Sequence, residues 1–243
     1  MRDIIVISDI FDKGLGDHFC ASAALRSYYN NNFQAHKIVL FSQYPDLYAQ
    51  QTYINQSFGL EHLAALDYGA KTDFEYEKII HLYSNKDFKD KTNIVEQYCE
   101  KLGVKPEHYP NFEIRHNRYK FNKTILLALE AGQKHKSVWN AKEVEQELIK
   151  RFPEFNFVTT KQFEHLPADH LPEICSKMSG YVSINSGYYH LLHNKNHIKK
   201  GIHLYVGDVY KYKFGYKDSV HYKFDKIINV DNLCEVFYNT LCQ

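Results

Sequence analysis

The chain has 243 residues, of which 44% are apolar and 15% aromatic, so it is long enough to bury the cores of two compact units. Its formal net charge of +1 argues against a protein that coats nucleic acid with its whole surface. No apolar run is long enough for a membrane span, and we expect no signal peptide. The five cysteines form no CxxC pair, which excludes a zinc knuckle and a disulfide framework and favours a reducing cytoplasm.

Apolar strands alternate with amphipathic helices along the first part of the chain. The pattern predicts strands at residues 3–8, 37–42 and 78–84, and helices at residues 17–31, 46–57 and 93–102. The third of these helices has its apolar residues on one face and ends at Gly103, a common helix stop. Such β-α-β units build a mostly parallel sheet.

Residues 105–122 contain two prolines and no periodicity, so we expect a linker there. A second β-α series follows. It predicts strands at 124–129, 155–160, 181–185, 201–207 and 226–230, and helices at 140–151 and 231–241, the last with Asp231 as its N-cap. The sequence therefore predicts an α/β protein with two Rossmann-like lobes, residues 1–118 and 119–243. We expect the ligand in the cleft beyond the carboxyl ends of the strands.

The first candidate motif, Gly14-Leu15-Gly16-Asp17, lies just beyond the first strand. Glycine permits close approach of a ligand to the backbone, and Asp17 would begin the helix with its carboxylate facing the cleft. The alternative is that Asp17 only caps that helix. A dinucleotide fingerprint is disfavoured, because Phe19 stands where GxGxxG requires glycine or alanine.

The second motif, "LEAGQKHKSVW" at residues 129–139, follows the first strand of the second series. It offers Gly132 for a tight turn, and then Lys134 and Lys136, whose flexible ammonium groups suit a diphosphate. The alternative is an exposed basic loop with Trp139, the single tryptophan, packed beneath it.

The third motif, "SINSGYYHLL" at residues 183–192, lies at a strand-to-helix junction. Backbone amides at Ser186 and Gly187 and the helix dipole would form a phosphate seat, and His190 lies one helical turn further. The alternative for His190 is a half-buried, hydrogen-bonded histidine. A zinc site made with His193 and His197 is a weaker interpretation, since no cysteine or acid joins them.

Residues 193–226 are rich in lysine, tyrosine and phenylalanine. Such a mixture suits an anionic acceptor, for example a phosphorylated lipid or a nucleic acid. A solvated, lysine-rich surface is the alternative.

Taken in order, the three motifs resemble those of the heptosyltransferase-like glycosyltransferases, glycosyltransferase family 9. The first match is "KGLGDHFCASAALRSYYNNNFQAHKIVLFS", similar to the family's GxGD opening with its helix and second strand. The second is "KTILLALEAGQKHKSVWNAKEVEQELIKRFPEFNFV", and the third is "YVSINSGYYHLLHNKNHIKKGIHLYVG", similar to the family's SGxxH segment. Together they cover about two fifths of the chain.

This resemblance implies a shortened GT-B fold and an inverting, metal-independent glycosyltransferase that needs no cofactor. Asp17 would match the general base. The donor, a nucleotide-diphosphate sugar such as an ADP-heptose, would contact the matching segments at Gly16, Gly132, Lys134, Lys136, Asn185, Ser186, Gly187 and His190. The acceptor would be a glycan or a lipid-linked, anionic molecule such as lipopolysaccharide, with the protein in the cytoplasm or at the inner membrane surface.

Two other functions stay open at this point. The family commonly has aspartate where this chain has Asn185, and Glu130 stands near the expected diphosphate. These departures fit a sugar-nucleotide- or glycan-binding protein without transfer activity. The lysine-tyrosine stretch fits a transferase or binding protein that acts on nucleic acid.

Overall fold

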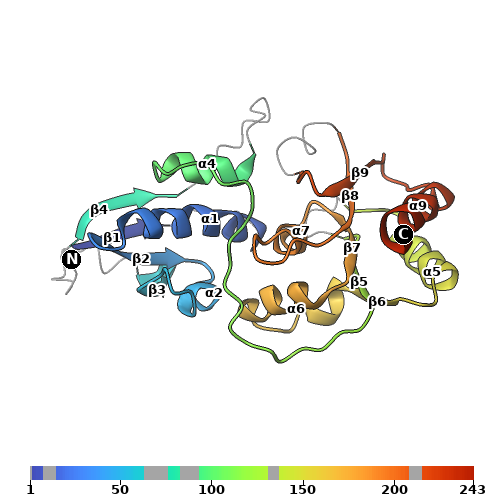
Figure 1. Ribbon diagram of the computed structural model, residues 1–243, viewed down its shortest axis with the longest axis horizontal. Coiled ribbons are helices and arrows are strands. Elements are labelled where there is room, and N and C mark those ends of the chain that lie inside the picture. Colours follow the sequence, from blue (N-terminus) through green and yellow to red (C-terminus); the bar gives the residue numbers. More distant parts are fainter. Residues whose placement is uncertain (1, 8–14, 63–75, 83–92, 131–136, 208–214) are drawn as a thin grey trace.

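The computed structural model describes residues 2–7, 15–62, 76–82, 93–130, 137–207 and 215–243 (Figure 1). Two parallel sheets lie side by side, one in each half of the chain. The first has the order β3-β2-β1-β4, with β1 at Arg2–Ile7, β2 at His36–Ser42, β3 at Gln56–Gly59 and β4 at Tyr76–His81. Its helices are α1 at Leu15–Asn32, α2 at Pro45–Ala49 and α4 at Ile94–Lys101.

The second sheet has the order β6-β5-β7-β8-β9, and all its pairs are parallel. Its strands are β5 at Thr124–Ala128, β6 at Asn156–Thr159, β7 at Gly180–Ile184, β8 at Gly201–Tyr205 and β9 at Ser219–Lys223. The helices are α5 at Ala141–Arg151, α6 at Leu171–Lys177, α7 at Gly187–Leu192 and α9 at Val230–Phe237. The mixed α/β architecture with two parallel sheets is confirmed. None of the helices among these residues combines the length and the apolar character needed to cross a bilayer.

Strand alternation divides the buried side chains between two cores. Leu126 of β5 and Tyr181 of β7 face the first core, together with residues of α1, α4, α6 and α7. Ile125, Leu127 and Val182, which alternate with them, face the second core under α5 and α9. In Figure 1, α6 and α7 accordingly lie on the side of the second sheet that faces the first, and α5 and α9 lie on the far side. The first core therefore belongs to both halves of the chain.

The predicted helix at 46–57 is wrong in its second half. The helix α2 ends at Ala49, and the following turn is bonded to β2 instead of continuing the helix. The Asn55 amide donates to the Ile38 carbonyl at 2.9 Å, and the Ile38 amide donates to Asn55 Oδ1 at 3.0 Å. Because this pair places the next residues beside β2, they form the edge strand β3.

The predicted strand at 226–230 is also wrong, since the fifth strand of the second sheet is β9. Lys226 has a φ of 51°, a left-handed conformation that breaks an extended segment. The N-cap of α9 is Asn229, whose side chain accepts a hydrogen bond from the Asn232 amide, so Asp231 is not the cap. Asp231 pairs instead with Arg151 of α5 at 2.6 Å.

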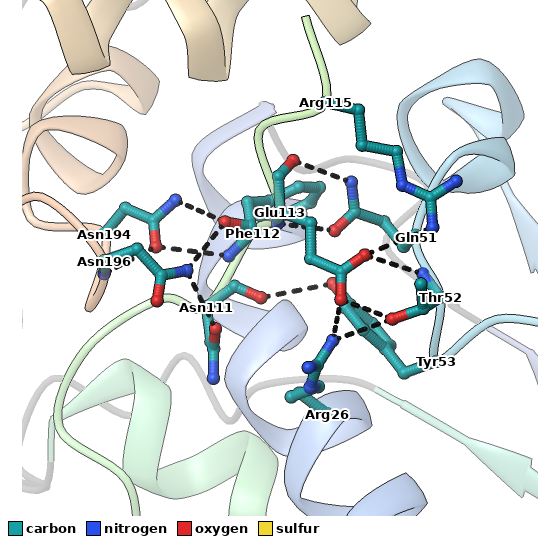
Figure 2. Close-up of polar contacts among 10 residues, drawn as sticks. All are labelled: Arg26, Gln51, Thr52, Tyr53, Asn111, Phe112, Glu113, Arg115, Asn194 and Asn196. Carbon is teal, nitrogen blue, oxygen red and sulfur yellow. Dashed lines mark hydrogen bonds and ion pairs between the residues drawn. The ribbon is translucent and has the colours of Figure 1, made fainter.

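Residues 105–122 form no helix or strand, as predicted, but they are not a loose linker. Phe112 is fully buried between the two halves. The segment is held on one side by Asn194 and Asn196, and on the other by residues of α1 and of the turn after α2, as Figure 2 shows. The chain between α4 and β5 is thus a packed connection between both halves.

Candidate active site

The first turn of α1 lies directly against the first turn of α7. A Cβ atom added to Gly16 would lie 3.0 Å from His190 Cδ2 and 3.1 Å from Gly187 Cα. A Cβ atom added to Gly187 would lie 3.1 Å from the Gly16 amide nitrogen. Glycine at both positions permits this close approach, which joins two of the three predicted motifs although they are far apart in the chain.

Asp17 lies in the first turn of α1, two residues after the helix begins, so it is not the N-terminal cap. Its Oδ1 accepts a hydrogen bond from the Tyr98 hydroxyl at 3.1 Å. The side chain of Tyr98 is fully buried, whereas Asp17 is half-buried. The carboxylate lies near the positive end of the α1 dipole, which interacts favourably with a negative charge.

The residues that we predicted to bind a phosphate lie at the junction between β7 and α7. Ser186 is the N-cap of α7, and its side chain accepts from the Tyr189 amide. The Oδ1 atom of Asn185 is buried and has no hydrogen-bond partner in the described part of the chain. A buried acceptor of this kind is normally paired, so a donor group on a ligand would satisfy it.

His190 is buried, and its Nδ1 lies 2.8 Å from the Tyr216 hydroxyl. His190 is therefore a hydrogen-bonded, buried histidine, as the alternative interpretation expected. The edge of its ring also lies against Gly16, where α1 and α7 meet. His193 is bonded elsewhere, with Nε2 3.1 Å from the Tyr181 hydroxyl, and burial lowers its pKa to about 4. Within the described residues, no three histidine, cysteine or acidic side chains are grouped so that they could hold a metal ion.

Three of the predicted donor-binding residues, Gly132, Lys134 and Lys136, lie outside the described residues. The flanking residues are described. Glu130 forms an ion pair with Lys161 at 2.7 Å, so its charge is compensated by a residue that the motif does not contain. Trp139 is 64% exposed, which contradicts the interpretation that it packs beneath this loop.

The lysine-tyrosine stretch is only partly described. In the described part, Lys195 pairs with Glu107 at 3.1 Å, and Asp218 accepts a hydrogen bond from Tyr109. These contacts tie the stretch to residues near the start of the connecting segment. Binding of an anionic acceptor or a nucleic acid by this stretch stays a prediction.

A small cavity lies away from these motifs, between α2, α6 and residues 113–116. Its volume of about 10 Å³ is room for one water molecule at most, and it contains none of the predicted site residues.

The sequence placed Tyr98 only on the apolar face of a predicted helix, and it did not mark Tyr216 as a candidate site residue. No local pattern marks either hydroxyl, because each partner lies far away in the chain.

Comparison with known proteins gives no match for the sequence itself, neither to a protein-family profile nor to a curated protein. Solved structures do match. The heptosyltransferase WaaC from E. coli, solved with ADP, is similar with a TM-score of 0.69 and 11% identity, over 98% of this chain and 99% of that chain. A glycosyl transferase family 9 protein from Veillonella parvula gives a TM-score of 0.64 and 11% identity, over 98% and 88%.

A third match is the dodecameric, iron-containing heptosyltransferase TibC from E. coli, in complex with ADP-D-beta-D-heptose. It has a TM-score of 0.62 and 14% identity, over 90% of this chain but only 63% of its own. At such identities the likeness concerns the fold. The resemblance that the three motifs suggested is confirmed at that level, and the chain has a glycosyltransferase-like GT-B fold in a short form.

Proposed function

We propose that the chain is a glycosyltransferase that moves a sugar from a nucleotide-diphosphate sugar to an acceptor hydroxyl. The fold shared with the three sugar transferases supports this proposal. The observation that carries it is the contact between the first turns of α1 and α7. This contact brings the backbone beside Asp17 against Gly187 and His190.

In the proposed reaction, Asp17 is the general base. Its carboxylate takes the proton of the acceptor hydroxyl while the oxygen attacks the anomeric carbon. The bond from that carbon to the diphosphate oxygen breaks, and the diphosphate leaves with the bonding electrons. Direct attack from the opposite face inverts the anomeric centre. General-base assistance of this kind contributes about 10²–10⁴ in rate.

The donor would bind in the C-terminal half, residues 119–243, and the acceptor in residues 1–118. We propose that Gly132, Lys134 and Lys136 contact the diphosphate. The start of α7 would complete the diphosphate site, so that fixed donors stabilise the leaving group without a metal ion. Asn185 Oδ1 would accept a hydrogen bond from a hydroxyl of the sugar nucleotide. The ADP and ADP-heptose in the neighbouring structures make an ADP-heptose-like sugar the first donor to test. We propose a glycan or a lipid-linked molecule as the acceptor, as the resemblance of the motifs implies.

The experiment has two stages. A panel of nucleotide sugars is first tested by thermal shift, because a ligand raises the melting temperature once its concentration exceeds its Kd. The best donor is then used in transfer assays with wild type and Asp17→Asn. We expect the variant to lose about 10²–10⁴ in kcat and to bind the donor as wild type does.

Asp46→Asn is the matched control, since Asp46 also lies in the first turn of a helix in the same half but is exposed. It should transfer at the wild-type rate. Transfer that continues with a chelator present would support the metal-independent reaction. Full activity of Asp17→Asn would remove Asp17 from the role of base.

A second candidate is a binding protein of the same fold that performs no transfer. Asn185 supports it, because an amide at this position can bind a ligand but cannot accept a proton from one. Calorimetry with the donor panel, alongside assays for transfer and donor hydrolysis, separates the two functions. Donor binding without turnover on any acceptor would favour the second.

A further inference from the structure

The hydroxyl of Tyr98, on α4, donates a hydrogen bond to the Asp17 carboxylate of α1. Tyr98 lies on the buried face of α4, where Ile94 and Val95 pack beside it against α1. Asn93 caps the start of this helix by accepting from the Val95 amide. The ring is therefore held by its own packing, and the hydroxyl is fixed independently of any ligand.

Two further described groups lie near the first turn of α1, one on α1 itself and one on α7. Cys20 lies about one turn along α1, and burial, together with the Asp17 charge, raises its thiol pKa. His190 of α7 presents its ring edge to Gly16 and is bonded to Tyr216. Tyr98 donates its hydrogen bond to Asp17 Oδ1 at 3.1 Å.

We propose that Tyr98 is the positioning residue of Asp17. This proposal rests on the proposed function, in which Asp17 is the general base. By donating to Oδ1, Tyr98 fixes the rotamer in which the carboxylate takes the proton of the acceptor hydroxyl. It also favours the ionised carboxylate, because a hydrogen bond to the charged form stabilises that form. Tyr98 would orient the base Asp17 by a hydrogen bond, in the way that a third residue orients the base in other catalytic sites. Tyr98 itself would not contact the substrate.

The test compares Tyr98→Phe with Tyr53→Phe. Both substitutions remove the hydroxyl of a fully buried tyrosine in the same half of the chain, but the Tyr53 hydroxyl bonds the Asn111 carbonyl and not Asp17. In Tyr98→Phe we expect kcat to fall about tenfold with the donor KM unchanged. The acidic limb of the kcat–pH profile should move to higher pH, because the base must be ionised and its pKa has risen. Tyr53→Phe should retain the wild-type profile.

Carbon NMR of the Asp17 carboxyl gives a readout that does not depend on turnover. Its pKa should rise in Tyr98→Phe and stay unchanged in Tyr53→Phe. If wild type transfers sugar and the two variants have the same profile and the same Asp17 pKa, the positioning role is overturned. If wild type transfers no sugar, the role in transfer fails with the proposed function, and the NMR result still decides whether Tyr98 controls the carboxylate.

Discussion

Glu113 is the side chain that holds the connecting segment to the N-terminal half. Its carboxylate accepts hydrogen bonds from the Arg26 guanidinium, from the Thr52 hydroxyl and, at 3.0 Å, from the Thr52 amide (Figure 2). Its own backbone pairs with Gln51 through two further bonds. Burial alone would raise the pKa of the Glu113 carboxyl, but the bonds from Thr52 and Arg26 outweigh burial and lower the pKa to about 2.

This shift predicts how stability depends on pH. The folded pKa lies below the ordinary value of 4.5, so the stabilisation is complete above about pH 4.5 and is lost as the pH falls toward 2. In Glu113→Gln the free energy of unfolding at pH 7 should decrease by about 1–3 kcal/mol. Its dependence on pH between 4.5 and 2 should be weaker than in wild type. Urea unfolding at several pH values measures both, and parallel curves for the two proteins would contradict the assignment.

The residues of the candidate site could be predicted from the sequence only where a local pattern marks them. Gly16 and Gly187 lie at strand-to-helix junctions, and a short motif of neighbouring residues marks each of them in the sequence. Tyr98 and Glu113 carry no such mark. Each lies more than 80 residues from its partner on α1, and only the packing of helices shows the contact.

At the level of elements, the periodic segments were predicted well and the short connections poorly. The helix α4 follows its apolar face and ends as expected before Gly103, which has a φ of 64°. The edge strand β3 and the helix α6 were not predicted, because pairing with β2 and packing in the first core decide them. The five cysteines are free, as the sequence suggested.

The contact between β7 and β8 provides a test at the level of elements. Gly201 pairs with Tyr181, and a Cβ atom added to Gly201 would lie 2.4 Å from the Tyr181 carbonyl oxygen. Gly201→Ala must therefore displace the strand backbone, and we expect a loss of about 1–3 kcal/mol in the free energy of unfolding. Val220→Ala on the neighbouring strand, which is partly exposed, should cost less. Equal denaturation midpoints for Gly201→Ala and wild type would show that the strands are not this close.

At the scale of the whole molecule, the two halves share a core and a connecting segment, although each has its own sheet. The Asn194 side chain, buried in the C-terminal half, donates to the Phe112 carbonyl at 2.8 Å and accepts from the Phe112 amide at 3.3 Å. Phe112 packs against Phe19 and Tyr48 of the N-terminal half. We therefore expect the wild type to unfold in one cooperative transition, although two-sheet proteins of this length commonly unfold in steps.

Asn194→Ala should break this cooperativity, since it leaves the Phe112 amide buried without its partner and removes the buried bond from Asn194 to the Phe112 carbonyl. Trp139 reports on the C-terminal half by fluorescence, and circular dichroism reports on all helices. The two unfolding curves should coincide in wild type and separate in Asn194→Ala. For the half with the lower midpoint, we expect the free energy of unfolding to fall by about 1–3 kcal/mol. The exposed Asn196, which also donates to the Phe112 carbonyl at 3.1 Å, is the matched control, and Asn196→Ala should keep coincident curves because water can replace its bond. Coincident curves in Asn194→Ala would mean that the shared apolar core alone couples the halves, without the contribution of the connecting segment.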